Sequence, residues 1–443
     1  MTVHVDPTMQ SRERNHALPV AGVRRYAVSP DGGAAINPMQ FGMTSHPPSR
    51  LFAPVLASIS LIGPMVIHLY FPVIPVVKIA LRLSDAEAQL TFSIALFCMA
   101  FATLAYGALS DRYGRRRLML SGLSIFLFGS VFAFAAESIA MMVIGRSLQA
   151  IGAACGVTLV RAIASDVYGP GQLVKVIAYL TMFYTLGPMI SPMVGGLLID
   201  TLGWRSVFGF ALVVGSLILA GAYAAIPETR SAERPAQASF LRGYRELLGS
   251  IRFSPFVLQT GFSTGTFLTI ATASSAFMKE LLDRPSFEFG LYFLLFPLGF
   301  LFGSFISTRL SGRVVNETMV MTGATLSLAS VAVQSGFLLS GHVTPLVLFV
   351  PGFFVTMAQG LSLPFGQAAA LAVNPKLVGM AAGLGVFMQN FGGAVFSQLY
   401  GLLSNGTPGP LVLTTAITAM LSLICAMIPF VMMLRARSKA GLP

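Results

Sequence analysis

The sequence is divided into long apolar runs, each about as long as a lipid bilayer is thick. Twelve runs reach about 20 residues or more, and they begin near Leu51, Ala88, Leu118, Ile139, Gly171, Trp204, Pro255, Phe287, Glu317, Thr344, Lys376 and Gly409. Only 10% of the 443 residues are charged, whereas a soluble protein carries about 25%. The pattern predicts an all-α integral membrane protein with twelve transmembrane helices.

The predicted spans form two groups of six. An N-terminal bundle over 51–226 has spans at about 51–77, 88–109, 118–137, 139–165, 171–199 and 204–226. A C-terminal bundle over 255–435 has spans at about 255–278, 287–309, 317–340, 344–369, 376–403 and 409–435. Residues 227–254 are predicted to form a central loop, 1–50 a disordered tail and 436–443 a short tail. Glycines at matching places in the two halves indicate pseudo-symmetric repeats.

The positions of the basic residues predict the orientation in the membrane. Of 28 Lys and Arg residues, only five would lie in loops opposite the two tails, and these are Lys78, Arg82, Arg205, Lys279 and Arg284. Basic residues concentrate in cytoplasmic loops, so both termini and the central loop are predicted to be cytoplasmic. The net charge of +12 is spread over these loops and does not indicate a nucleic-acid-binding face.

The sequence lacks the motifs of enzyme chemistry. Cys98, Cys155 and Cys425 each lie inside an apolar run, which favours small buried side chains over a metal site. There is no nucleophile–base pair, zinc spacing or phosphate-binding glycine loop. We therefore expect no enzyme activity, no cofactor and no metal.

A short charged stretch, GALSDRYGRRR at 107–117, separates the second and third predicted spans. It resembles the G-x-L-x-D-R-x-G-R-[RK]-x signature of the major facilitator superfamily at Gly107, Leu109, Asp111, Arg112, Gly114, Arg115 and Arg116. The resemblance implies a conformational latch, in which Asp111 docks near the start of span eleven, around Lys376. A carboxylate at a helix N-terminus gains about 0.3–1 kcal/mol, which suits a reversible contact. Alternatively, these charges set the topology alone.

The fifth predicted span carries GPMISPMVGGLL at 187–198. Its small residues and prolines recur every four residues, at Gly187, Pro188, Ser191, Pro192, Gly195 and Gly196. Small residues at this spacing let helices approach closely, so a packing ribbon is one interpretation. The run also resembles the antiporter motif of superfamily exporters. With GWRSVF at 203–208 and PETR at 227–230, it resembles the bicyclomycin/chloramphenicol-resistance branch of drug:proton antiporters.

This resemblance implies a function in antibiotic resistance. The chain would export small, largely hydrophobic drug-like compounds from the cell in exchange for protons, as a monomer in the inner membrane. Its partners would be a small-molecule substrate, protons and the lipid bilayer. Two alternatives remain, namely a substrate–proton symporter or passive facilitator, and a membrane receptor or scaffold without transport.

Span four places Arg146 and Gln149 three residues apart on one helix face. A guanidinium in hydrocarbon costs about 2.5–3.5 kcal/mol, so Arg146 is predicted to face the protein interior rather than to snorkel. The related antiporters usually carry an Asp where this chain has His68, and no acid lies deep in any span. His68 is thus the predicted proton-coupling residue and a possible neighbour of Arg146, unless it is simply packed as a neutral ring. The other predicted cavity residues are Tyr70, Tyr184, Gln259 and Asn390.

Overall fold

The computed structural model describes residues 51–439 except 169, 230–239 and 375–376, and every regular element in these residues is a helix. The predicted tail 1–50, part of the central loop, Lys376 and residues 440–443 lie outside the described residues.

The N-terminal half consists of seven helices, which are α1 (Phe52–His68), α2 (Val73–Ala80), α3 (Asp85–Tyr113), α4 (Arg115–Phe134), α5 (Ile139–Val167), α6 (Pro170–Leu202) and α7 (Arg205–Ala225). A short helix, α8 (Phe240–Leu248), follows in the central loop. The C-terminal half consists of α9 (Ser254–Ala276), the π-helical turn η3 (Phe277–Leu281), α10 (Ser286–Phe293), α11 (Leu295–Leu310), α12 (Asn316–Leu339), α13 (Pro345–Ala372), α14 (Val378–Leu403) and α15 (Gly409–Lys439).

These helices make the chain a multi-pass membrane protein. In the described residues, ten helical segments are long and apolar enough to cross a membrane, and α1 with α2 adds an eleventh as a bent pair. The remaining predicted span, the seventh at about 255–278, corresponds to α9, whose many Ser and Thr residues make it less apolar than the others. Most of its side chains are buried among neighbouring helices, so they do not need to suit lipid.

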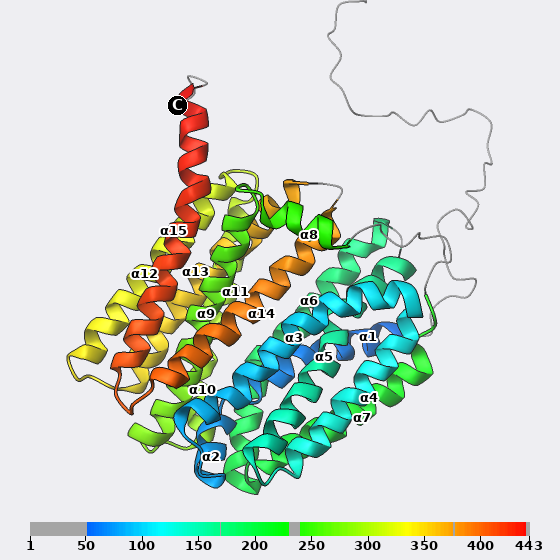
Figure 1. Cartoon of the computed structure of the whole chain (residues 1–443), viewed down its shortest axis with the longest axis vertical. Helices are drawn as coiled ribbons and strands as arrows, with labels where there is room; N and C mark the ends of the chain where they lie inside the picture. Colours follow the sequence, from blue (N-terminus) through cyan, green and yellow to red (C-terminus); the bar gives the residue numbers. More distant parts are fainter. Residues whose placement is uncertain (1–50, 169, 230–239, 375–376, 440–443) are drawn as a thin grey trace, which may run out of the picture. The chain divides into compact units, whose positions relative to one another are not determined.

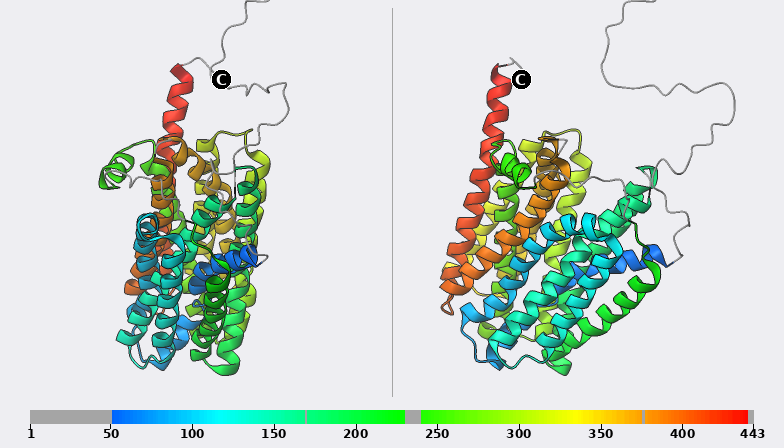
Figure 2. Two further views of the ribbon diagram at one scale, coloured as in Figure 1. Left: turned by 90° about the vertical axis from the view of Figure 1, so that its right-hand side faces the viewer. Right: turned by 45° about the vertical axis from the view of Figure 1, so that its right-hand side comes forward.

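The two halves are separate bundles that meet mainly along two pairs of helices. Within each half, the helices pack mainly on one another, and Figure 2 shows the two groups side by side. Between the halves, α3 lies against α14, and α6 lies against α10 (Figure 1). The predicted fold of two six-helix bundles is therefore confirmed. We name the two ends of the bundles after one residue each. The Gly114 end contains Gly114, which joins α3 to α4, and the Lys78 end contains Lys78 in the last turn of α2.

The first span is broken, although the sequence predicts a single helix over 51–77. The axes of α1 and α2 differ by 53°, and residues 69–72 form a turn between them. Pro72 has no backbone N–H with which to continue the helix, and this contributes to the break. In the other half, a break at Leu294 separates α10 from α11. The two breaks meet across the boundary, where the Phe71 and Phe293 ring centroids are 5.2 Å apart.

Candidate functional site

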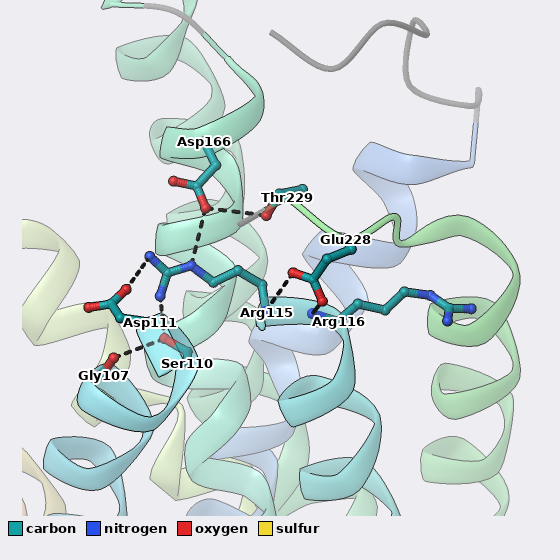
Figure 3. Close-up of polar contacts among 8 residues, drawn as sticks. All are labelled: Gly107, Ser110, Asp111, Arg115, Arg116, Asp166, Glu228 and Thr229. Atoms are coloured by element: carbon teal, nitrogen blue, oxygen red, sulfur yellow. Dashed lines mark hydrogen bonds and ion pairs between the residues drawn. The ribbon is translucent and has the colours of Figure 1, made fainter. Parts of the chain in front are cut away.

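A carboxylate closes the turn between α3 and α4 at the Gly114 end. Gly114 has φ +97°, a backbone conformation that side chains with a Cβ rarely adopt. A Cβ at this position would also lie 2.5 Å from Oε2 of Glu228. The Glu228 carboxylate accepts hydrogen bonds from the backbone N–H groups of Arg115 (2.7 Å) and Arg116 (3.2 Å) (Figure 3). Glu228 therefore caps the N-terminus of α4.

The Arg115 side chain joins three helices of the N-terminal half. Its guanidinium pairs with Asp111 at 2.8 Å and with Asp166 of α5 at 3.1 Å, and it also donates to the Ser110 hydroxyl (Figure 3). The side chain of Arg115 is only 8% exposed, whereas that of Asp111 is 58% exposed. Lys376, the expected docking partner of Asp111, lies outside the described residues. In this conformation the described partner of Asp111 is Arg115, four residues further on.

Arg116 ties α4 to the end of α7. Its guanidinium donates to the carbonyl oxygens of Ile226 and Tyr223, both at 2.8 Å, and lies over the Tyr223 ring. Arg112 stacks over Tyr113 with 5.3 Å between its guanidinium carbon and the ring centroid. The basic residues of this turn therefore make specific contacts with backbone carbonyl groups and aromatic rings.

Arg146 is buried at the broken end of α1. Its side chain is 1% exposed, and it donates to the carbonyl oxygens of Val66 (3.1 Å) and Thr91 (3.3 Å) and to Oε1 of Gln149 (2.5 Å). The last carbonyl groups of a helix lack partners within the helix and carry partial negative charge. The C-terminus of α1 therefore stabilises this buried cation in the absence of a carboxylate partner among the described residues.

Tyr70 completes the surroundings of Arg146. Its ring centroid is 4.0 Å from the guanidinium carbon, and its hydroxyl donates to Thr91 Oγ1 at 2.7 Å. Gln149 in turn donates to the Ser130 hydroxyl at 2.9 Å. A cavity of about 10 Å³ beside these groups has room for about one water molecule. The structure thus joins three of the predicted cavity residues, Tyr70, Arg146 and Gln149, in one buried polar cluster.

His68 has different surroundings. Its Nδ1 lies 2.8 Å from the carbonyl oxygen of Pro64, and its ring packs edge-on against Phe71 and Phe293. Residues two apart in a helix point about 200° apart, so His68 and Val66 lie on different faces of α1. His68 therefore sits where the two halves touch, whereas Arg146 lies inside the N-terminal half. The structure describes no contact between the two side chains.

The small residues of α6 face two different helices. A Cβ on Gly187 would lie 2.5 Å from Pro64 Cβ, and one on Gly195 would lie 2.7 Å from the Leu69 carbonyl oxygen, so both glycines pack against the first span. A Cβ on Gly196 would lie 2.3 Å from the carbonyl oxygen of Ser286 in the C-terminal half. Pro188, Ser191 and Pro192 lie between these contacts in the same continuous helix. The small residues of α6 therefore pack on the first span of their own half and also contact the other half.

Charged side chains join the halves at the Lys78 end. The two carboxylate oxygens of Asp200, near the end of α6, accept from the backbone N–H groups of Ser286 (3.1 Å) and Phe287 (2.8 Å) at the start of α10. Lys78 pairs with Asp85 of its own half and with Glu280 of the other half, the latter at 2.6 Å. These contacts lie at the end of the molecule opposite Gly114.

The remaining predicted cavity residues are dispersed. Tyr184, on α6, is 37% exposed and lines a cleft with Arg161 of α5. Gln259 is buried within the C-terminal half, where it donates to Ser422 at 3.2 Å. Asn390 donates to the carbonyl oxygen of Val386 in its own helix. The structure does not bring these three side chains to the Arg146 cluster.

A family model described as the Major Facilitator Superfamily matches residues 56–397. The chain belongs to the Major Facilitator Superfamily. The predicted resemblance is therefore confirmed, and the chain is a transporter rather than an enzyme.

Curated superfamily relatives match most of the chain. Multidrug resistance protein D of Escherichia coli (strain K12) is 26% identical over 372 residues, which cover 82% of this chain and 92% of the relative. The bicyclomycin resistance protein homolog of Haemophilus influenzae is 24% identical over 394 residues, which cover 86% of this chain and 96% of the relative.

Solved structures of other transporters share the fold. A bacterial homolog of the human lysosomal transporter Spinster, in an inward-facing and occupied conformation, has a TM-score of 0.70 at 16% identity, covering 88% of this chain and 97% of that one. A D-xylose–proton symporter has a TM-score of 0.69 at 14% identity, covering 85% of this chain and 96% of that one. At this level of identity the likeness concerns the fold alone.

Several contacts of the candidate site were not predicted from sequence. Glu228 lies in the PETR stretch, but nothing in that stretch indicates that it caps α4, 113 residues earlier. Asp166 is an acid near the end of a span, which is an ordinary place for one. Arg161 counts among the topology-setting basic residues in sequence, yet the structure places it in a cleft with Tyr184. Asp200 also follows an apolar run without any sign of its contact with α10.

Proposed function

We propose that this chain exports small, largely hydrophobic drug-like compounds in exchange for protons, by alternating access between two six-helix halves, 51–226 and 255–435. The two relatives named above are called multidrug and bicyclomycin resistance proteins, which supports this substrate class. The position of α6 is the observation that carries the mechanism. This helix packs through glycines on α1 of its own half and on α10 of the other half, so the halves can separate along it without disrupting either bundle.

We assign the Gly114 end to the cytoplasm, in the inner membrane of the cell. Support comes from the arginines at 112 and 115–117, since basic residues concentrate on the cytoplasmic side. Both termini and the central loop 227–254 are then cytoplasmic, and the contacts at the Lys78 end face outward. A single chain contains both halves, so we propose that the monomer is functional.

We propose that the Gly114-end turn acts as a conformational latch. Asp111 is the exposed member of its network, so it is free to exchange Arg115 for a partner in the other half. Asp111→Asn is expected to reduce transport at least tenfold while membrane insertion stays intact. Transport at the wild-type rate would show that the turn acts on topology alone.

We propose His68 as the proton-coupling residue. Its ring lies against Phe71 and Phe293, where the two halves meet, so separation of the halves would expose it to water. An imidazole exchanges protons near physiological pH, which suits coupling to a pH gradient. The chain offers no carboxylate deep in its spans for this role.

Transport in proteoliposomes with an imposed pH gradient tests the proposed function. Wild-type protein should accumulate a hydrophobic dye against its gradient only when the pH gradient is present. His68→Ala should abolish accumulation but retain downhill exchange of dye, and His68→Asp should restore accumulation. Dye transport that does not depend on the pH gradient would favour a passive facilitator. Dye transport in the same direction as the protons would favour a symporter.

A further inference from the structure

The interior of the membrane spans carries only positive ionised groups. At six or more residues from either end of the candidate spans, the described residues include two such groups, Arg146 and Arg161, and no acid. Asp166 and Asp200 lie within the last residues of their spans and already bind partners there. An organic cation among these spans would therefore find no carboxylate partner in the described residues.

The two arginines differ in the partners that their guanidinium groups have. Arg146 is engaged by carbonyl groups, an amide and an aromatic ring, as described above. Arg161 is exposed, and in the part of the chain that the structure describes it has no hydrogen bond or ion pair. An ionised side chain inside a membrane span that lacks a protein partner is a candidate for binding a ligand.

Arg161 lines a cleft between α1, α5 and α6. Figure 1 shows these three helices within the N-terminal half. The cleft has a volume of about 20 Å³, and its polar groups come from Ser60, Arg161, Thr181 and Tyr184. The Tyr184 hydroxyl, like Arg161, has no hydrogen-bond partner among the described residues. The apolar part of the lining consists of Gly156, Val157, Val160, Ile177 and Leu180.

We infer that Arg161 and Tyr184 bind the carboxylate of an amphiphilic substrate, so that the transporter prefers compounds with an anionic group to purely cationic ones. This inference rests on the proposed transport function and names the substrate class. A guanidinium offers paired donors that match a carboxylate, and the tyrosine hydroxyl supplies a further donor. The cleft accommodates little more than the head group, while the aliphatic walls contact the adjoining apolar part.

The depth of the cleft distinguishes this site from a simple membrane-surface contact. Tyr184 lies about 13 Å beyond the start of its candidate span at Lys175. An arginine that only reached towards lipid head groups would point away from the membrane interior. Arg161 instead shares its cleft with a tyrosine deep in the span.

A matched pair of dyes tests the inference by binding alone. Rhodamine 110 carries a free carboxylate, and rhodamine 123 is its methyl ester. Fluorescence polarisation with the full-length protein in neutral detergent should show that rhodamine 110 binds at least tenfold more tightly than rhodamine 123. Because the assay needs no gradient, failure of proton-coupled export in proteoliposomes leaves its result unaffected.

Variants of the cleft should remove this preference selectively. Arg161→Gln should make the two dyes bind equally, Arg161→Lys should retain part of the preference, and Tyr184→Phe should weaken rhodamine 110 binding about threefold. Arg117→Gln is the matched control, since it removes one exposed arginine from the Gly114 end. It should leave the affinities for both dyes unchanged.

Three results would overturn the inference: equal or tighter binding of rhodamine 123, no binding of either dye, or a preference that persists in Arg161→Gln. A lipid phosphate offers the same anionic oxygen chemistry as a carboxylate. The assay is therefore repeated in phosphatidylglycerol and phosphatidylcholine nanodiscs. Loss of rhodamine 110 binding only in phosphatidylglycerol would assign the cleft to a lipid head group instead of a substrate.

Discussion

The two ends of the molecule use the same chemistry for different purposes. At the Gly114 end, Glu228 lies two residues beyond the N-terminal half and binds the backbone N–H groups at the start of α4 in that half. At the Lys78 end, Asp200 binds the corresponding groups at the start of α10, which belongs to the other half. A carboxylate at a helix N-terminus is favourable in both cases. Only the second contact has to break when the halves separate.

The difference predicts two kinds of mutational effect. Changes in the Gly114-end network should lower the stability of one half, because all of its contacts except the Asp111–Arg115 pair persist through the transport cycle. Changes at the Lys78 end should shift the balance between conformations and leave each half folded. Thermal unfolding in detergent reports the first effect, and the labelling rate of a buried interfacial cysteine reports the second.

Arg115→Ala should have the largest effect on stability. It removes a nearly buried guanidinium and leaves the Asp166 carboxylate, whose side chain is 10% exposed, without this partner. Breaking such a pair costs about 3 kcal/mol, so thermal unfolding in detergent should shift to clearly lower temperature. Arg117→Ala, at an exposed neighbouring position, is the control. Equal melting of the two variants would show that the network is not structural.

Gly196→Leu should have the largest effect on closure of the Lys78 end. The added side chain would collide with the Ser286 carbonyl of the other half, and overpacking of this kind costs about 1–3 kcal/mol. The reporter is Ser93→Cys in a chain without its native cysteines, because Ser93 is buried against Gln398 of the other half. Its labelling should accelerate about tenfold.

Gly195→Leu is the matched comparison, since Gly195 faces Leu69 of its own half. This variant should lower the melting temperature and leave the labelling of the reporter nearly unchanged. Slow labelling in both variants would mean that α6 does not hold the halves together at this end.

Asp200→Asn should have the smallest effect. It removes the charge at the start of α10, which is worth about 0.3–1 kcal/mol and corresponds to a roughly two- to fivefold faster labelling of the reporter. Glu228→Gln makes the same chemical change at the other end and should alter melting instead of labelling. A similar response of the two variants in both assays would remove the distinction between the ends.

The sequence predicts the fold well because membrane spans depend on local composition. Apolar runs of sufficient length and the placement of basic residues are readable without any tertiary information. Two features of the fold escape this kind of reading. At the break at 69–72, the Val66 carbonyl finds its donor in Arg146, 80 residues away, and α9 tolerates its many hydroxyl groups because other helices bury it.

The candidate site was predictable only in part. Residues close together in sequence, such as Arg146 and Gln149, also bind each other in the structure. Contacts between distant segments were not predictable, as with Lys78 and Glu280 or Glu228 and the start of α4. His68 and Arg146 lie at similar distances in sequence from a predicted end of their spans, so they are expected at similar depths in the membrane. The depth does not say which face of a helix a side chain occupies, and His68 lies on a different face of α1 from Val66, which binds Arg146.

The contact between Arg146 and the open end of α1 also bears on how the protein is made. Hydrocarbon offers no hydrogen-bond donor to a free carbonyl group, so the end of α1 stays unfavourable there until α5 arrives. A nascent chain stopped after α4 should therefore leave its first segment loosely inserted and sensitive to protease. Once the ribosome has added α5, the early segments have their missing donor, and the N-terminal half can assemble before the remaining spans are translated.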